Sequence, residues 1–187
     1  GPSEVLIIAD GANDPAWIAA DLLAQAEHDP SAQAIVITDD KDFAEAVEEA
    51  VDRHLETLAR AEVAGQSWRR FGAIVTVSQL DEAVRLIDRL APEHLELAID
   101  DPGALAAKVR NAGAIFLGRH TPEALGDYVA GPNHVLPTSR SARFSSGLGV
   151  QDFVKRSTFV GCDAEGLAKL GPAARTLAQA EGLSAHA

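Results

Sequence analysis

Short apolar runs alternate along the chain with longer stretches in which apolar residues recur every three or four positions. The apolar runs predict four β-strands, at residues 4–9, 34–38, 73–77 and 114–117. Because these runs are continuously apolar, we expect strands buried on both faces, as in a parallel sheet. The helical spacing between them predicts helices at residues 15–28, 40–60, 80–90 and 102–110. The pattern is typical of an α/β fold, mainly a parallel sheet with flanking helices.

The helical and strand patterns stop at Thr121, where Gly, Pro, Ser and Asn dominate as far as about Gly149. A long loop inside a compact domain is usually functional or disordered, so we expect the chemistry of the protein near it. After the loop, the pattern predicts a short strand at 157–160, a helix at 164–180 and a tail at 181–187.

Composition narrows the class of protein. The 187 residues are 47% hydrophobic and 24% charged, which excludes a disordered, collagen-like or disulfide-stapled chain. Acidic residues outnumber basic ones by 28 to 16, so the net charge of −12 disfavours a nucleic-acid-binding surface. No run approaches the ~18 apolar residues of a membrane span, and no signal-peptide pattern opens the chain. We therefore predict a cytoplasmic protein that does not contact a membrane.

Two further features of the sequence concern the cellular compartment and the length of the whole protein. Cys162 is the single cysteine, so an internal disulfide is impossible, which agrees with a reducing compartment. Met is absent, also at position 1, and the chain begins directly before a predicted strand. Such a beginning is typical of a piece of a longer protein.

The first candidate site lies at the end of the first predicted helix. Gln25 and His28 are three residues apart, so both side chains lie on one helix face and can share a cation. Gln is an unusual ligand for transition metals, and a solvated His28 that interacts with the helix dipole explains the same pattern.

A second candidate is Glu93-His94, directly after Pro92. An imidazole titrates near neutrality and a neighbouring carboxylate can orient water, so the pair is suited to general acid–base catalysis. The alternative interpretation is a helix N-terminus with Glu93 in its first turn.

The long loop carries Asp127 and His134 among Gly and Pro residues, where backbone can approach a ligand closely. The alternative for Asp127 and Asn133 is turn chemistry, in which their side chains cap their own backbone. His186 is the penultimate residue, and its position alone predicts a free histidine on a frayed tail.

Taken together, six stretches between residues 1 and 148 resemble the histidinol dehydrogenase family. They are residues 1–4 (GPSE), 22–28 (LLAQAEH), 91–97 (APEHLEL), 111–118 (NAGAIFLG), 126–138 (GDYVAGPNHVLPT) and 142–148 (ARFSSGL). The resemblance implies an incomplete Rossmann-like fold, similar to that of aldehyde dehydrogenases, with a C-terminal helical tail. It implies two domains: residues 1–150, catalytic and zinc-binding, and residues 151–187, a helix and tail exchanged within a homodimer.

The family carries out the last step of histidine biosynthesis, two NAD-dependent oxidations of L-histidinol through histidinaldehyde to L-histidine. By resemblance, Gln25, His28, Asp127 and His186 are zinc ligands that also contact substrate, with His186 supplied by the other subunit. Glu93 and His94 resemble the catalytic pair. His94, which also contacts the substrate, removes the alcohol proton, and Glu93 activates water for the aldehyde step. Ser3, His134 and Glu181 resemble positions that contact histidinol.

One departure from the family concerns the cofactor. Family members are more than twice as long, and their N-terminal part carries the NAD-contacting residues, so we assign no NAD site within this chain. A glycine fingerprint for dinucleotides is also absent from the sequence. Two other interpretations stay open: a zinc-binding fragment without redox activity that needs a separate N-terminal part, and a nonenzymatic α/β interaction domain.

Overall fold

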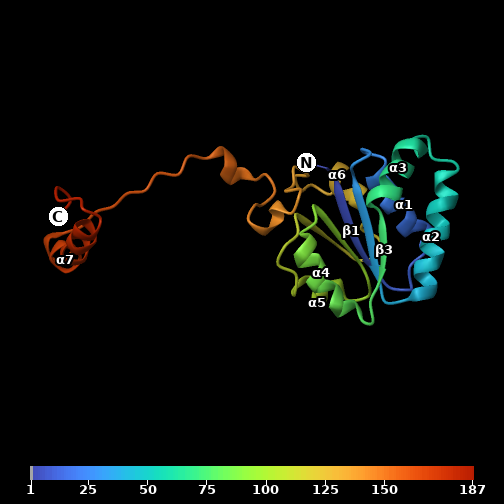
Figure 1. Cartoon of the computed structure of the whole chain (residues 1–187), viewed down its shortest axis with the longest axis horizontal. Helices are drawn as coiled ribbons and strands as arrows, with labels where there is room; N and C mark the ends of the chain where they lie inside the picture. The colour runs from blue at the N-terminus through green and yellow to red at the C-terminus, as the bar shows by residue number, and fades with distance from the viewer. Residues whose placement is uncertain (1) are drawn as a thin grey trace. The chain divides into compact units, whose positions relative to one another are not determined.

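Five parallel strands form the sheet at the centre of the first part of the chain (Figure 1). The strands are β1 (Glu4–Ala9), β2 (Gln33–Thr38), β3 (Ala73–Thr76), β4 (His94–Ala98) and β5 (Ala114–Leu117). Their order across the sheet is β3-β2-β1-β4-β5, and each neighbouring pair is parallel. The predicted α/β fold class with a parallel sheet is therefore confirmed.

The structure is a computed structural model that describes residues 2–187, so Gly1 of the first motif lies outside it. The chain divides into two units, Gly1–Asp152 and Phe153–Ala187, each of which is described by itself. The first contains the sheet, and the second contains α7 (Ala164–Ala180).

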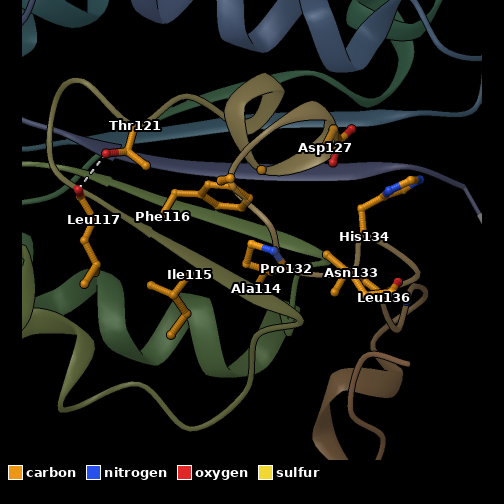
Figure 2. A pocket seen from close by; sticks show the side chains of 12 residues that line it. Ala114, Ile115, Phe116, Leu117, Thr121, Asp127, Pro132, Asn133, His134 and Leu136 are labelled. Atoms are coloured by element: carbon orange, nitrogen blue, oxygen red, sulfur yellow. Dashed lines mark hydrogen bonds between the residues drawn. The ribbon is translucent and has the colours of Figure 1, made fainter. Parts of the chain in front are cut away.

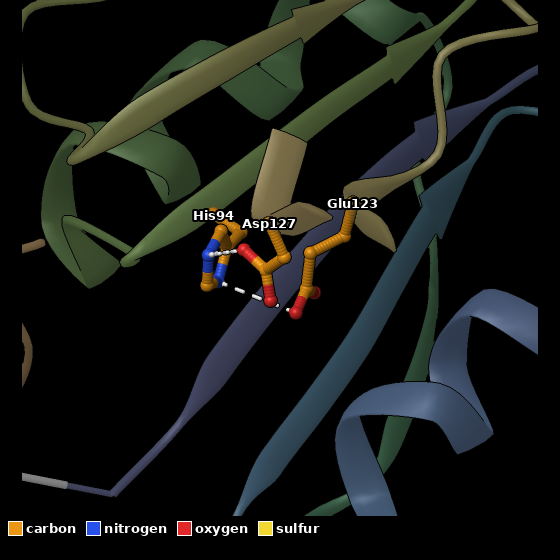
Figure 3. A group of neighbouring side chains, drawn as sticks. All are labelled: His94, Glu123 and Asp127. Atoms are coloured by element: carbon orange, nitrogen blue, oxygen red, sulfur yellow. Dashed lines mark ion pairs between the residues drawn. The ribbon is translucent and has the colours of Figure 1, made fainter. Parts of the chain in front are cut away.

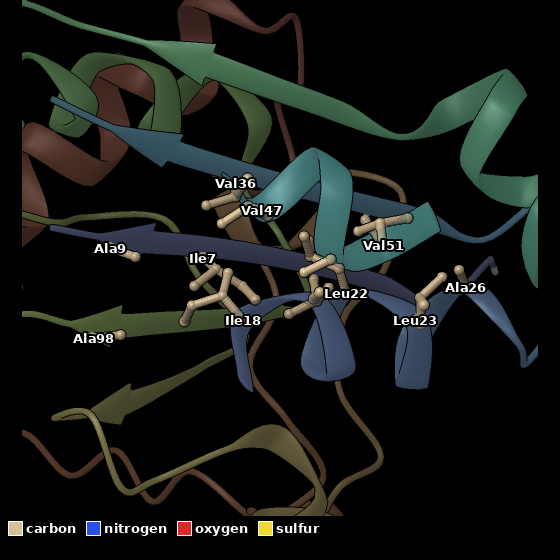
Figure 4. Packing of buried hydrophobic residues seen from close by; sticks show 14 of the residues in the cluster. Ile7, Ala9, Ile18, Leu22, Leu23, Ala26, Val36, Val47, Val51 and Ala98 are labelled. Carbon is tan, nitrogen blue, oxygen red and sulfur yellow. The ribbon is translucent and has the colours of Figure 1, made fainter. Parts of the chain in front are cut away.

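Helices cover both faces of the sheet. On one face lie α1 (Pro15–Ala26), α2 (Lys41–Leu55) and α3 (Ala61–Phe71), and on the other lie α4 (Ala83–Leu90) and α5 (Pro102–Ala106). Successive strand residues point to opposite faces, so Ile7 packs with α1 and α2 (Figure 4), whereas Leu6 packs with α4. This two-sided burial is the physical reason for the continuously apolar runs.

Aspartates begin several of these helices. The Asp14 Oδ1 accepts from the Ala16 backbone N–H at 2.9 Å, and Pro15 follows as the first helical residue. The Asp40 Oδ1 accepts from the Phe43 N–H at 3.0 Å. Such caps satisfy N–H groups that the first turn leaves unpaired, so the helix starts predicted at these residues are confirmed.

The helix predicted at residues 40–60 is present as α2 but already ends at Leu55, and the helix α3, which begins at Ala61, was not predicted. Arg60 precedes α3 and makes no side-chain capping bond, so the usual signal of a new helix is missing. Three other helices end earlier or begin later than predicted: α1 ends at Ala26, α5 ends at Ala106, and residues 80–82 form the 3₁₀ turn η1 before α4.

The segment at residues 91–97 is not a helix N-terminus but leads into strand β4, which the pattern did not predict. Ala91 ends α4 in the left-handed region with φ 50°, and the chain then enters the sheet between β1 and β5. His94 and Glu96 interrupt the apolar run of this strand, so the usual signal of a buried strand is absent.

The long loop also contains regular structure. The helix α6 (Glu123–Tyr128) and the 3₁₀ turn η2 (Ser141–Arg143) lie within it, and η3 (Val150–Phe153) follows. The strand predicted at residues 157–160 is wrong, because this segment has no regular structure and leaves Phe159 95% exposed. A strand needs a hydrogen-bonding neighbour, and β-branched or aromatic residues alone do not supply one.

In the second unit, Asp163 caps α7 by accepting from the Gly166 N–H at 2.7 Å. After the helix the chain turns back, and Leu183 donates to the Ala178 carbonyl at 2.9 Å. The His186 N–H donates to the Leu183 carbonyl at 3.0 Å, so the tail forms ordered turns. Among residues 2–187, no helix is both long and apolar enough to cross a membrane.

Candidate active site at the amino edge of the sheet

The candidate site lies where β1 and β4 begin. Ser3 directly precedes β1 and Glu93 directly precedes β4, and parallel strands bring their amino ends to the same edge. The end of α1, helix α6 and the loop after α6 reach the same edge. Together they line a cavity of about 290 Å³ with nine residues: Ser3, Gln25, His28, Glu93, His94, Glu123, Asp127, Tyr128 and His134.

Seven of the residues predicted to form the site therefore line one cavity: Ser3, Gln25, His28, Glu93, His94, Asp127 and His134. Glu181 and His186 belong to the second unit and stay predictions as site residues. Asn133 adopts the turn alternative, because its side-chain oxygen accepts from the Val135 N–H at 2.6 Å. Glu123 and Tyr128, the first and last residues of α6, were not predicted, because no helix was expected within the long loop.

The opposite edge of the sheet is built differently. Open parallel sheets usually bind ligands at the carboxyl ends of their strands. Here that edge is bridged by Arg119, which donates to Asp10 after β1 at 2.6 Å and to Asp100 after β4 at 2.9 Å. The polar cavity of this chain lies at the amino ends instead.

His94 is oriented by the first residue of β1. Its Nδ1 lies 3.0 Å from the Glu4 backbone oxygen, which can only accept, so Nδ1 carries the proton. The other ring nitrogen, Nε2, is then unprotonated and lies 3.6 Å from the Asp127 Oδ1. Within the described part of the chain, these two buried atoms have no hydrogen-bond partner.

Burial sets the protonation of both members of the Glu93-His94 pair. Burial raises the pKa of Glu93 to about 7, and the nearby charges of Glu4 and Asp127 act in the same direction. Burial lowers the pKa of His94, which favours the neutral imidazole. A base is most effective when its pKa lies near the working pH, which suits Glu93 to accept a proton. The lowered pKa of His94 keeps its imidazole neutral, so that its unprotonated nitrogen can accept one.

Glu123 supports the wall of the cavity. With the Gln25 amide oriented so that its nitrogen faces Glu123, that nitrogen donates to the Glu123 Oε2 at 3.0 Å and to the Glu4 carbonyl at 3.2 Å. The Glu96 carboxylate in turn accepts from the Glu123 backbone N–H at 2.8 Å, at the start of α6. The two buried glutamates thus fix Gln25 and the short helix that carries Asp127.

Burial also raises the pKa of Glu123 to about 9, and the charges of Asp127, Glu93 and Asp21 act in the same direction. Burial likewise raises the pKa of Glu96 well above its ordinary value. The Glu123 carboxyl group is therefore protonated at neutral pH.

We expect this proton to make the stability of the metal-free chain pH-dependent. Because the pKa of Glu123 is higher in the fold than its ordinary 4.5, its stabilising contribution is full below about pH 4.5 and is lost as the pH rises through about 9. Thermal unfolding in the presence of a chelator should show a smaller loss of stability between pH 5 and pH 8 for Glu123→Gln than for the parent. The exposed Glu48→Gln serves as control, and equal losses in both variants would contradict the assignment.

Three side chains of the cavity form a group that could hold a cation. One ligand atom each of His94, Glu123 and Asp127 lies within 4.8 Å of the others (Figure 3). The predicted ligands Gln25, His28 and Asp127 line the same cavity, so Asp127 is common to both sets. Mixed nitrogen and oxygen donors suit Zn²⁺, and the two unpartnered atoms, His94 Nε2 and Asp127 Oδ1, fit a site that binds a cation.

An apolar hollow of about 250 Å³ adjoins the polar cavity and shares Asp127 and His134 with it (Figure 2). Its walls come mainly from β5 and from the loop after α6. A Cβ atom at Gly126 would lie 2.3 Å from the Phe116 ring, so α6 packs on β5 with no room for a side chain at that position. This close packing of α6 on β5 fixes the position of Asp127, which lines both the polar cavity and the apolar hollow.

Comparison with known proteins agrees with this architecture. The sequence family described as histidinol dehydrogenase matches residues 1–187. The chain belongs to the histidinol dehydrogenase family. The histidinol dehydrogenase of Rhodospirillum rubrum is 67% identical over 187 residues, and that of Caulobacter vibrioides is 60% identical over the same length. The family predicted from the six motifs is confirmed.

The fold is also similar to a solved member of the histidinol dehydrogenase family. The crystal structure of the enzyme from Elizabethkingia anophelis matches the whole chain with a TM-score of 0.89 at 39% identity. The chain covers 43% of that structure, 43% of the Rhodospirillum rubrum protein and 44% of the Caulobacter vibrioides protein. It thus spans less than half the length of these relatives.

Proposed function

We propose that this chain is the catalytic and zinc-binding part of a histidinol dehydrogenase, which oxidises L-histidinol through histidinaldehyde to L-histidine. The observation that carries the proposal is the Glu93-His94 pair at one cavity with Gln25, His28 and Asp127. Membership of the family supports it, and the alternative of a nonenzymatic interaction domain gives no reason for two bases with shifted pKa values in a polar cavity.

In the alcohol step, His94 is the base. Its Nε2 is free to take the hydroxyl proton of histidinol, while the Glu4 carbonyl holds the protonated Nδ1 and keeps the ring in place. In the aldehyde step, Glu93 takes a proton from water, and the resulting hydroxide adds to the carbonyl carbon. NAD, when bound, supplies the oxidising power by accepting a hydride in each step, and we assign it no residue of this chain.

We propose that Gln25, His28 and Asp127 hold Zn²⁺ together with a His186 that the other subunit of a homodimer supplies. A zinc ion at these residues would act as a Lewis acid that binds the imidazole and amino nitrogens of histidinol and so orients the substrate. Glu123 contributes by holding the Gln25 amide nitrogen, which leaves the amide oxygen as the group that can bind a cation. Ser3, His134 and Glu181 are the proposed further contacts to the substrate.

Self-association follows from the proposed role of His186. We expect a homodimer in which each subunit supplies this histidine to its partner's site. Sedimentation velocity of the chain at micromolar concentration with zinc should therefore show a dimer. A strictly monomeric species would contradict exchange of the tail by this chain.

The function is tested by joining the chain to the N-terminal part that its longer relatives carry. The joined protein should form NADH when supplied with histidinol, and the 187-residue chain alone should form none. A joined protein without this activity would contradict the proposal. The alternative function is a zinc-binding fragment without redox activity that needs a separate N-terminal part, and the 43% coverage of the relatives favours it. It predicts that the 187-residue chain binds zinc, and that NADH forms only when the N-terminal part is supplied as a separate chain.

A further inference from the structure

Glu4 connects three segments of the site although it does not line the cavity. It is the first residue of β1, directly after Ser3, and it is buried. Its carboxylate Oε2 accepts from the Glu93 N–H at 3.3 Å, and its Oε1 accepts from the Ser139 N–H at 3.0 Å. One side chain therefore bridges the start of β4 and the long loop.

The backbone of Glu4 makes a separate set of contacts. Its N–H donates to the Glu93 Oε2 at 3.0 Å, and its carbonyl oxygen accepts from the His94 Nδ1 at 3.0 Å. The Glu4 backbone thus holds the side chains of both proposed bases, whereas the Glu4 side chain holds the backbone of Glu93 and of the loop. A substitution that changes only the side chain leaves the His94 contact in place.

The loop segment that Glu4 holds is strained. Ser139 and Arg140 have φ values of 54° and 66°, a left-handed conformation that residues other than glycine adopt only when their surroundings enforce it. Arg140 donates to the Arg89 carbonyl at 2.7 Å, near the end of α4, so its side chain supplies one of the enforcing contacts. The Glu4 carboxylate supplies another at Ser139.

Gly113 packs closely against both the Glu93 backbone and this loop. A Cβ atom at Gly113 would lie 2.5 Å from the Glu93 carbonyl oxygen and 3.2 Å from the ring of Pro137. Pro137 is buried and precedes Ser139 by two residues. Gly113, which directly precedes β5, is thus a common neighbour of the loop and of the short segment that presents the Glu93 carboxylate to the cavity.

We infer that Glu4 is a positioning residue, whose carboxylate holds Glu93 and the Ser139 loop in a fixed relation so that the Glu93 carboxylate reaches the water of the aldehyde step. The inference rests on the proposed function for its catalytic part. Because the Glu4 backbone holds His94, the side chain of Glu4 serves the step that needs Glu93 more than the step that needs His94.

Glu4→Gln tests this role in the joined protein. The amide has the shape of the carboxylate but offers one acceptor oxygen instead of two, so either the Glu93 N–H or the Ser139 N–H loses its partner. We expect oxidation of supplied histidinaldehyde to slow by about 10- to 100-fold in kcat, the scale of one lost charge-assisted hydrogen bond, with a much smaller effect on the histidinol step. If Glu4 had a merely structural role, the rates of both oxidation steps would fall in proportion to the loss of folded protein.

Amide hydrogen exchange provides a readout that does not depend on activity. In the parent we expect slow exchange at the Glu93 and Ser139 amides, and in Glu4→Gln faster exchange at one of them. The exposed Glu48→Gln makes the same chemical change and should match the parent in both assays. Unprotected amides in the parent, or equal slowing of the two oxidation steps, would overturn the inference. A joined parent without histidinol oxidation but with both amides protected would refute the proposed function and leave the carboxylate's hold on the two segments established.

Discussion

Replacing His94 by alanine in the joined protein is expected to slow the oxidation of histidinol by about 10²- to 10⁴-fold, the usual loss when a general base is removed. In the parent, the Nδ1 contact to Glu4 holds the ring so that the unprotonated Nε2 can take the alcohol proton. The alanine variant has no group that can take this proton. Glu93→Gln should instead impair oxidation of the aldehyde by a similar factor, because that step needs an activated water. Steady-state assays with histidinol and with histidinaldehyde separate the two steps.

The control for both variants is His120→Ala, because His120 is exposed and does not line the polar cavity. Its ring packs edge-to-face against that of Trp17, with the ring centroids 6.0 Å apart. It should retain the parent rates. Full activity of His94→Ala would refute the proposed base. Equal losses in both steps for Glu93→Gln would refute the assignment of Glu93 to water activation.

The second large effect concerns zinc. His28→Ala should weaken zinc binding by more than about 100-fold, beyond the 10- to 100-fold typical of residues that only support a ligand. Glu123→Gln should fall within that smaller range, because Glu123 holds Gln25 rather than the ion. Competition against a chelating dye measures both affinities, and elemental analysis should find about one zinc per parent chain.

The same measurement distinguishes two ways of placing the ion. In the proposed arrangement His94→Ala keeps its zinc, since His94 serves as a base. If the ion is held by the compact group His94, Glu123 and Asp127, His94→Ala loses zinc and His28→Ala keeps it. Asp127 belongs to both groups, so Asp127→Asn should weaken binding in either case.

The pH behaviour of the two glutamates follows from their different positions. Glu93 has a pKa of about 7, so a fraction of it is ionised at neutral pH and can take a proton from water. Burial, together with the charges of Asp127, Glu93 and Asp21, raises the pKa of Glu123 to about 9, so its carboxyl group stays protonated and supports structure. Two carboxyl groups of one cavity are thus suited to different roles because their surroundings differ.

The sequence by itself determined the fold class and named seven of the nine residues that line the candidate cavity. Continuously apolar runs such as Leu6-Ile7-Ile8 specify strands buried on both faces, and Asp14-Pro15 specifies where α1 begins. These are local signals, which a chain carries in its periodicity and its capping residues. The six motifs identified the family, and seven of the predicted site residues line one cavity.

Other features were decided only by the tertiary structure. Strand β4 was missed because His94 and Glu96 break its apolar pattern, and only pairing with β1 and β5 places that polar segment in the sheet. The roles of Glu4 and Glu123 depend on contacts with residues such as Ser139 and Gln25, which are distant in sequence. No local pattern encodes such contacts, because burial and neighbouring charges, which set the pKa values of Glu93 and Glu123, arise only when the strands and the loop meet at one edge of the sheet.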